Sequence, residues 1–150
     1  MELIFSEDKM PVKEVSELME KAALECLRIE GCPEERTEIS ISFVSDEEIR
    51  QLNRDYRQKD SVTDVLSFPQ YDDLEEAFED EIICLGDVVI CEEQARRQAE
   101  EFGHSYDREI IYLFVHSVFH LLGYDHIEDD DKAEMRAKEE QVMTALGLER

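Results

Sequence analysis

Basic residues are scarce in this sequence. Its 150 residues contain 16 Lys and Arg against 40 Asp and Glu, which gives a formal net charge of −24. Such a charge repels phosphate and anionic lipid, so it excludes a generally basic nucleic-acid coat and a polybasic membrane binder. Any polyanion must therefore bind at a local exception to the average charge. Hydrophobic residues still make up 42% of the chain, which is enough for a folded core.

Long apolar runs and paired cysteines are also missing. No run of 18 consecutive apolar residues occurs, and the first residues lack the basic start and apolar stretch of a signal peptide. We therefore expect a cytoplasmic protein without a membrane partner. The four cysteines, Cys26, Cys32, Cys84 and Cys91, form no CxxC pair, which disfavours a thiolate zinc site or a redox dithiol. They are predicted to be small core residues.

Repeats, low-complexity tracts and Gly/Ser linkers are absent, so the sequence indicates a single domain over residues 1–150. Alternating apolar residues predict strands, and apolar residues three or four positions apart predict helices. The fold class is therefore α+β, a mixed sheet of about four strands with helices packed on it. Strands are expected at residues 3–5, 39–43, 63–68 and 82–91, the last interrupted at Gly86 and Asp87, and helices at 12–30, 46–56, 92–102, 106–122 and 129–146. Residues 70–81, with seven acidic side chains, are expected to form a mobile loop.

Three of the four histidines lie close together, in the pattern HxxxHxxGxxH. Residues four apart share a helix face, so His116 and His120 can bind one metal ion. Gly123 permits a left-handed turn, after which the chain can bring His126 to the same ion. Three neutral imidazoles suit Zn²⁺ and leave a fourth position for water, as in catalytic zinc sites. The alternative is a set of core histidines bonded to the backbone. The fourth histidine, His104, is expected at the surface or at a helix cap.

This pattern resembles the extended zinc motif of metzincin peptidases, with one departure. Those enzymes carry a Glu directly after the first histidine, where it is the general base for amide hydrolysis. Ser117 occupies that position here, and a serine hydroxyl cannot replace a carboxylate base. We therefore expect a metzincin-like three-histidine metal site at the end of a buried helix, with a different substrate.

One short segment of the chain is basic. Residues 50–59 carry four basic side chains and one Asp, a net charge of +3. A metal-activated nucleophile suits phosphodiester cleavage, which also needs positive groups beside the phosphoryl oxygens. The planar fork of arginine binds phosphate well, so Arg54, Arg57 and Lys59 are the candidate substrate clamp. A solvated helix face with internal ion pairs is the alternative explanation of the same charges.

Three stretches make the sequence similar to the YbeY-type endoribonucleases, which are bacterial rRNA maturation factors. They are LNRDYRQKDSVTDVLSFP at residues 52–69, LGDVVIC at residues 85–91 and the histidine block at residues 116–126. The resemblance spans nearly the whole chain, and the first and third stretches are the specific ones. The sequence departs from the family at Ser117, where Gly is common, and at residues 61–62, where Lys-Pro or similar is common.

The resemblance implies cleavage of single-stranded RNA at a zinc site, with one Zn²⁺ per chain held by His116, His120 and His126. It also implies roles in maturation of the 16S rRNA 3′ end and in ribosome quality control, without specificity for DNA. Arg57 is the functionally important arginine in this interpretation, so His116 and Arg57 are the expected catalytic residues. Asp87 either orients one of the ligand imidazoles or lies at the surface.

Two other functions stay open at this point. One is a metal-dependent peptidase or amidase whose general base comes from elsewhere in the sequence. The other is a non-catalytic ribosome-assembly protein in which the metal only holds the C-terminal turn. The acidic charge favours docking on the ribosomal subunit through basic ribosomal proteins, and it predicts weak binding of free RNA.

Overall fold

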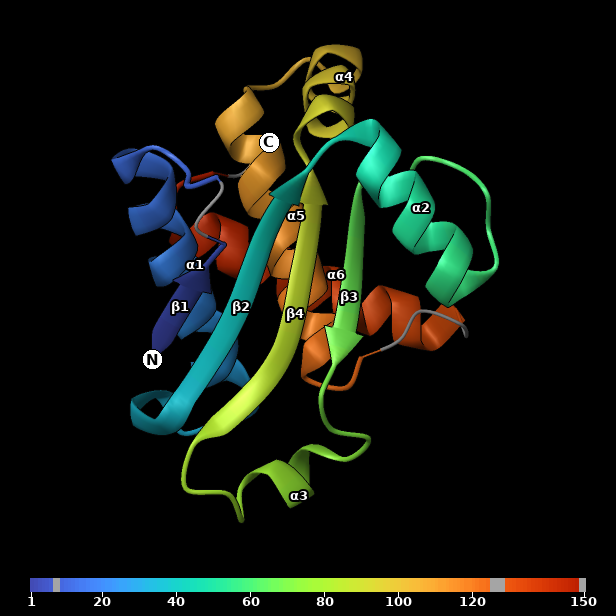
Figure 1. The fold of residues 1–150 in the computed structure, drawn as a ribbon. Helices are drawn as coiled ribbons and strands as arrows, with labels where there is room; N and C mark the ends of the chain where they lie inside the picture. Colours follow the sequence, from blue (N-terminus) through green and yellow to red (C-terminus); the bar gives the residue numbers. More distant parts are fainter. Residues whose placement is uncertain (7–8, 125–128, 149–150) are drawn as a thin grey trace.

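The computed structural model describes residues 1–6, 9–124 and 129–148, which build a four-stranded sheet with helices on both faces (Figure 1). The strands are β1 (Glu2–Phe5), β2 (Thr37–Val44), β3 (Val65–Pro69) and β4 (Ile83–Cys91), in the spatial order β1-β2-β4-β3. β1, β2 and β4 run parallel, whereas β3 pairs antiparallel with β4 and forms one edge. The predicted α+β class with a four-stranded mixed sheet is confirmed.

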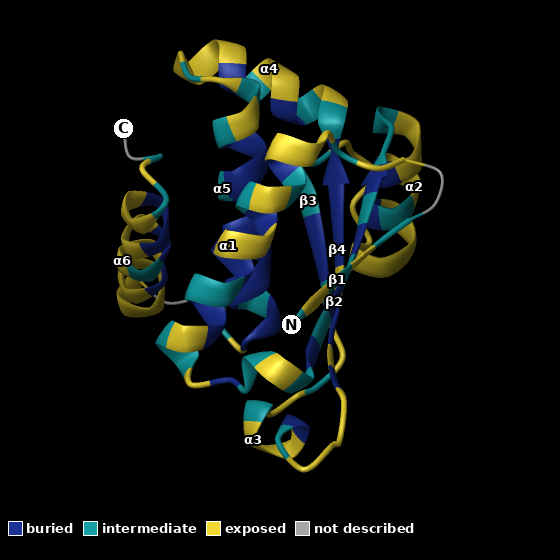
Figure 2. Ribbon diagram, turned by 90° about the vertical axis from the view of Figure 1, so that its left-hand side faces the viewer, coloured by how far each residue is buried: buried dark blue, intermediate teal, exposed yellow. Residues whose placement is uncertain are grey.

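The helices form layers on the two faces of this sheet. They are α1 (Lys13–Glu30), the short 3-10 helix η1 (Glu34–Arg36), α2 (Asp46–Arg57), α3 (Leu74–Ala77), α4 (Glu92–Phe102), α5 (Tyr106–Leu121) and α6 (Asp129–Ala145). Figure 2 shows α1 and α5 on one side of the sheet, α6 beyond α5, and α2 on the other side. None of the helices in the described ranges is long and apolar enough to cross a membrane.

Local signals in the sequence set the limits of several elements. Helix α2 begins with a capping box, because the Ser45 hydroxyl accepts from the Glu48 backbone while the Glu48 carboxylate accepts from the Ser45 backbone. Helix α1 ends at Gly31, which adopts the left-handed conformation expected of a C-cap. Strand β2 alternates buried and half-buried residues, as its sequence predicts.

Helix α5 is the central element of the core. Its apolar side chains are buried nearly all round, because α5 lies between the sheet on one side and helices α1 and α6 on the other (Figure 2). Three cysteines, Cys26, Cys32 and Cys91, are buried as predicted. Cys84 is exposed, so the prediction of a core position is wrong for this cysteine.

The acidic stretch at residues 70–81 is more structured than its charge predicts. Its centre forms the helix α3, where the Asp73 side chain accepts from the Glu75 backbone, and Ala77 is fully buried. Arg36 donates a hydrogen bond to the backbone oxygen of Asp80 at 3.0 Å. The prediction of a loop throughout is therefore wrong, because these contacts outweigh the repulsion between the acidic side chains.

Strand β4 is continuous through Gly86, contrary to the predicted interruption. Gly86 has φ +141°, and a Cβ atom at this position would lie 2.2 Å from the backbone oxygen of Phe68 on β3. The glycine therefore allows a close approach of two strands and does not end one. Asp87, which follows it, is exposed and pairs in register with Phe68.

Candidate active site

His116 and His120 lie side by side on α5, as their spacing predicts. Their Nε2 atoms are 3.1 Å apart, and the two rings are nearly perpendicular, with an interplanar angle of 85°. Two zinc–nitrogen bonds of about 2.0–2.1 Å can reach nitrogen atoms at this separation. The pair therefore has the geometry of two ligands of one metal ion.

The Nδ1 atoms of the same rings fix their tautomers. His116 Nδ1 lies 2.6 Å from Glu139 Oε2, and His120 Nδ1 lies 2.8 Å from the backbone oxygen of Tyr124. Both oxygens are acceptors, so the contacts place a proton on each Nδ1 and leave each Nε2 as the ring nitrogen that can bind a metal. Two lone pairs that face each other suit a shared cation better than a mutual hydrogen bond. The donor set therefore fits zinc, whose histidine ligands commonly donate their other N–H in this way.

Glu139 is the residue at this site that the sequence analysis missed. It belongs to α6, is only 3% exposed, and accepts a second hydrogen bond from the Tyr112 hydroxyl at 3.1 Å. Burial, together with the charge of Glu139, raises the pKa of Tyr112 to about 12, so this phenol stays protonated and donates. One signal was present in the sequence, because Glu139 shares the buried face of its helix with Met135. The carboxylate that contacts His116 is therefore Glu139, whereas Asp87, which was considered for this contact, is exposed on β4.

The turn after α5 follows the predicted course as far as Tyr124. Gly123 has φ +108°, and the Tyr124 backbone donates to the Phe119 backbone oxygen at 3.0 Å. His126, the predicted third ligand, lies outside the described residues. Within the described residues, no group of three His, Cys, Asp or Glu side chains is placed to hold a metal ion. The structure thus brings together the first two of the three predicted ligands.

A cavity of about 830 Å³ opens beside the two histidines. Its lining includes His116 and His120 together with Arg57 and Lys59, which come from the end of α2 and the segment after it. The sequence motifs predicted that these side chains belong to one site, and the structure places them around one cavity. Asp72 adds a carboxylate to the lining, from a stretch to which the sequence analysis assigned no catalytic residue.

The position of Arg57 is fixed by the edge strand β3. Its guanidinium donates to the Ser67 backbone oxygen at 2.7 Å. The Ser67 hydroxyl in turn lies 2.6 Å from the Ser117 hydroxyl, and Ser117 is fully buried between α5 and β3. Ser117, which stands where metzincin peptidases carry their catalytic Glu, is therefore packed in the core. It cannot act as the general base of such a peptidase.

The remaining arginines of the basic segment do not reach the cavity lining. Arg50 pairs with Asp60 at 2.8 Å, and Arg54 lies 3.4 Å from Asp55. The explanation by internal ion pairs therefore holds for these two side chains. Arg54 was expected to bind substrate together with Arg57, but the structure places it outside the cavity.

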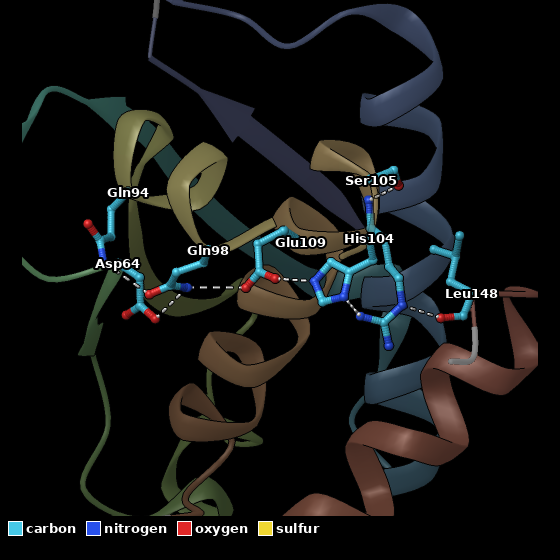
Figure 3. Close-up of polar contacts among 8 residues, drawn as sticks. Asp64, Gln94, Gln98, His104, Ser105, Glu109 and Leu148 are labelled. Atoms are coloured by element: carbon cyan, nitrogen blue, oxygen red, sulfur yellow. Dashed lines mark hydrogen bonds and ion pairs between the residues drawn. The ribbon is translucent and has the colours of Figure 1, made fainter. Parts of the chain in front are cut away.

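Of the two positions expected for His104, the structure shows the helix cap: its backbone donates to the Ala99 oxygen at 3.0 Å at the end of α4, and its side chain is not at the surface. Its side chain is 13% exposed, and its Nε2 atom lies 2.5 Å from a carboxylate oxygen of the buried Glu109. The Gln98 amide donates to both Glu109 and Asp64, at 3.2 Å each, and Figure 3 shows this chain of contacts. Asp64 also accepts from the Val65 backbone at 2.7 Å, so the network anchors the start of β3 beside the cavity.

Comparison with known proteins identifies the family of this chain. The family model for endoribonuclease YbeY matches residues 3–147. A protein named endoribonuclease YbeY from Finegoldia magna is 50% identical over 135 residues, which cover 90% of this chain and 85% of the relative. Another protein with this name, from Clostridioides difficile, is 47% identical over an alignment of 155 positions, which covers 100% of this chain and 99% of the relative. A solution structure of a Thermotoga maritima protein aligns with a TM-score of 0.67 at 26% identity, over 97% and 89% of the two chains. The resemblance seen in the sequence motifs is thus confirmed, and the chain belongs to the YbeY endoribonuclease family.

Proposed function

We propose that this chain is a zinc-dependent endoribonuclease that cleaves single-stranded RNA and acts in rRNA processing, at the 16S rRNA 3′ end and in ribosome quality control. Family membership supports the cleavage of RNA. The observation that carries the proposal is the pair of Nε2 atoms 3.1 Å apart in a cavity that Arg57 also lines. Imidazole nitrogens bind zinc and a guanidinium binds phosphate, so one cavity holds both parts that phosphodiester cleavage needs.

Each residue of the site has one task in this proposal. His116, His120 and His126 hold one Zn²⁺ per chain, which when bound favours loss of a proton from a water or from the ribose 2′-hydroxyl. Glu139 keeps Nδ1 of His116 protonated, so the Nε2 lone pair stays directed into the cavity. Arg57, with Lys59, stabilises the negative charge that develops on the phosphoryl oxygens.

The charge distribution supports a partner other than naked RNA. Arg57 and Lys59 are the basic side chains of the cavity lining among the described residues, whereas the whole chain carries a net charge of −24. Few phosphate contacts give weak binding to free RNA. An acidic surface instead complements basic ribosomal proteins, so the proposed target is RNA presented on a ribosomal subunit.

The test measures zinc content and cleavage of a single-stranded RNA for the parent protein and for H116A and R57A. We expect about one zinc per chain and chelator-sensitive cleavage in the parent, loss of both in H116A, and loss of cleavage with retained zinc in R57A. R28A is the matched control, because Arg28 is an exposed arginine of α1 that pairs with Glu25 and does not line the cavity.

The same proteins incubated with casein separate the alternative functions. Chelator-sensitive proteolysis with intact RNA would identify a peptidase or amidase. A melting temperature that falls on zinc removal, without turnover of RNA or casein, would identify a metal-stabilised assembly protein. Cleavage of RNA by H116A at the parent rate would contradict the proposal, because a contaminating nuclease is then the source.

A further inference from the structure

An exposed aromatic ring adjoins Arg57 in the chain, just outside the cavity lining. Tyr56 directly precedes Arg57 in the last turn of α2, and it is 63% exposed. Its ring meets the ring of Phe68 on β3 edge to face, with centroids 5.3 Å apart and an interplanar angle of 73°. Phe68 therefore supports the tyrosine while most of the tyrosine surface stays open to solvent.

The two rings and the histidines lie on opposite sides of the edge strand β3. Phe68 packs in the small apolar cluster under α2, whereas its neighbour Ser67 contacts Ser117 of α5. Figure 1 shows β3 at the edge of the sheet, with α2 beside it. Arg57 binds the backbone of this edge and lines the cavity. A single strand that leaves the cavity over β3 thus passes Arg57 and reaches Tyr56.

Unpaired nucleobases suit such a ring. Bases of single strands have free faces that stack on aromatic side chains, whereas bases inside a duplex are already stacked on their neighbours. We propose that Tyr56, supported by Phe68, is a stacking site for one unpaired base next to the phosphodiester bound by Arg57. This inference rests on the proposed function and names the residue that selects single strands.

Other aromatic side chains fit this role less well. Tyr71 and Tyr124 line the cavity itself, but both are partly buried and their hydroxyls donate to Asp80 and Glu30. Phe102 is 56% exposed, but it ends α4, and neither of its neighbours in the chain lines the cavity, whereas Arg57 beside Tyr56 does. Phe102 therefore provides a matched control of similar exposure.

The absence of tryptophan from the sequence gives a direct test. Y56W introduces a single indole that can stack as tyrosine does, and F102W introduces the same reporter away from the cavity. The zinc-loaded proteins are titrated with a short single-stranded 2′-O-methyl RNA and with its duplex. We expect the single strand to quench the fluorescence of Y56W, the duplex to leave it nearly unchanged, and F102W to respond to neither.

Kinetics of the otherwise unmodified protein provide the second measurement. Y56A should raise KM for a single-stranded RNA roughly 10-fold with little change in kcat, and Y56F should stay close to the parent, because a phenyl ring also stacks. Zinc content and melting temperature of Y56A report whether the site and the fold are intact.

Each other outcome has a defined meaning. Parent-like KM in Y56A, or equal quenching of Y56W and F102W, overturns the stacking site while RNA cleavage by the parent still supports the proposed function. Normal cleavage of free RNA by Y56A with lost binding to ribosomal subunits would make Tyr56 a protein contact and also overturn it. Failure of the parent to cleave RNA would refute the proposed function separately, and quenching of Y56W would still decide whether a base stacks there.

Discussion

Replacing Glu139 with glutamine tests how far the histidine pair depends on α6. The carboxylate is buried and accepts from two donors, His116 Nδ1 at 2.6 Å and the Tyr112 hydroxyl at 3.1 Å. Glutamine keeps the size but replaces one acceptor oxygen with an amide that donates, so one of the two partners meets a donor. Loss of such a ligand-orienting group typically weakens metal binding about 10- to 100-fold, or about 1.4–2.7 kcal/mol.

The assay is competition for zinc between the protein and a coloured chelator of known affinity. E139Q should show this weakened zinc affinity. Y112F should lower the free energy of zinc binding by only about 1 kcal/mol, because this variant removes one hydrogen bond and leaves the carboxylate in contact with His116. E140Q is the control, since the neighbouring carboxylate is exposed. Parent-like zinc affinity in a folded E139Q protein, with zinc binding lost in H116A, would refute the argument that Glu139 directs His116.

Three further results are expected. G86A should lower the free energy of unfolding by about 3 kcal/mol or more in urea, because its Cβ would meet the Phe68 backbone, whereas G31A, in open space, should cost only about 1–2 kcal/mol for its left-handed backbone. E109A should lower the free energy of unfolding by about 3 kcal/mol, because it leaves His104 and the Gln98 amide without their buried partner. A decrease below about 0.5 kcal/mol would contradict this argument. The affinity for single-stranded RNA should fall with salt at a log–log slope of about −1.4, as two phosphate contacts predict, and a slope near −2.8 would mean that all four basic side chains of the segment bind.

The sequence predicted those features that depend on residues close together in the chain. The capping box of Ser45 and Glu48 and the facing of His116 and His120 each arise within about one helical turn, so the local pattern suffices. Glu139 could not be found in this way, because it meets His116 only after α6 packs on α5. Residue types alone likewise did not show which arginine of α2 lines the cavity. Arg50 and Arg54 lie beside acidic side chains instead, and these contacts depend on the folded chain.

Under the proposed function, the electrostatics of the cavity and the stacking site together would let an acidic protein select single-stranded RNA. Arg50 and Arg54 lie close to acidic side chains, so the positive charge beside the histidines comes from the two basic side chains of the lining. With a slope of about −1.4, doubling the salt concentration lowers affinity only about 2.6-fold, whereas loss of one stacked base lowers it roughly 10-fold. In this proposal the ring of Tyr56 distinguishes unpaired bases from stacked ones, which attraction between charges does not do. Binding measured at two salt concentrations for the parent and Y56A should show two independent losses, because stacking and counterion release act on different groups.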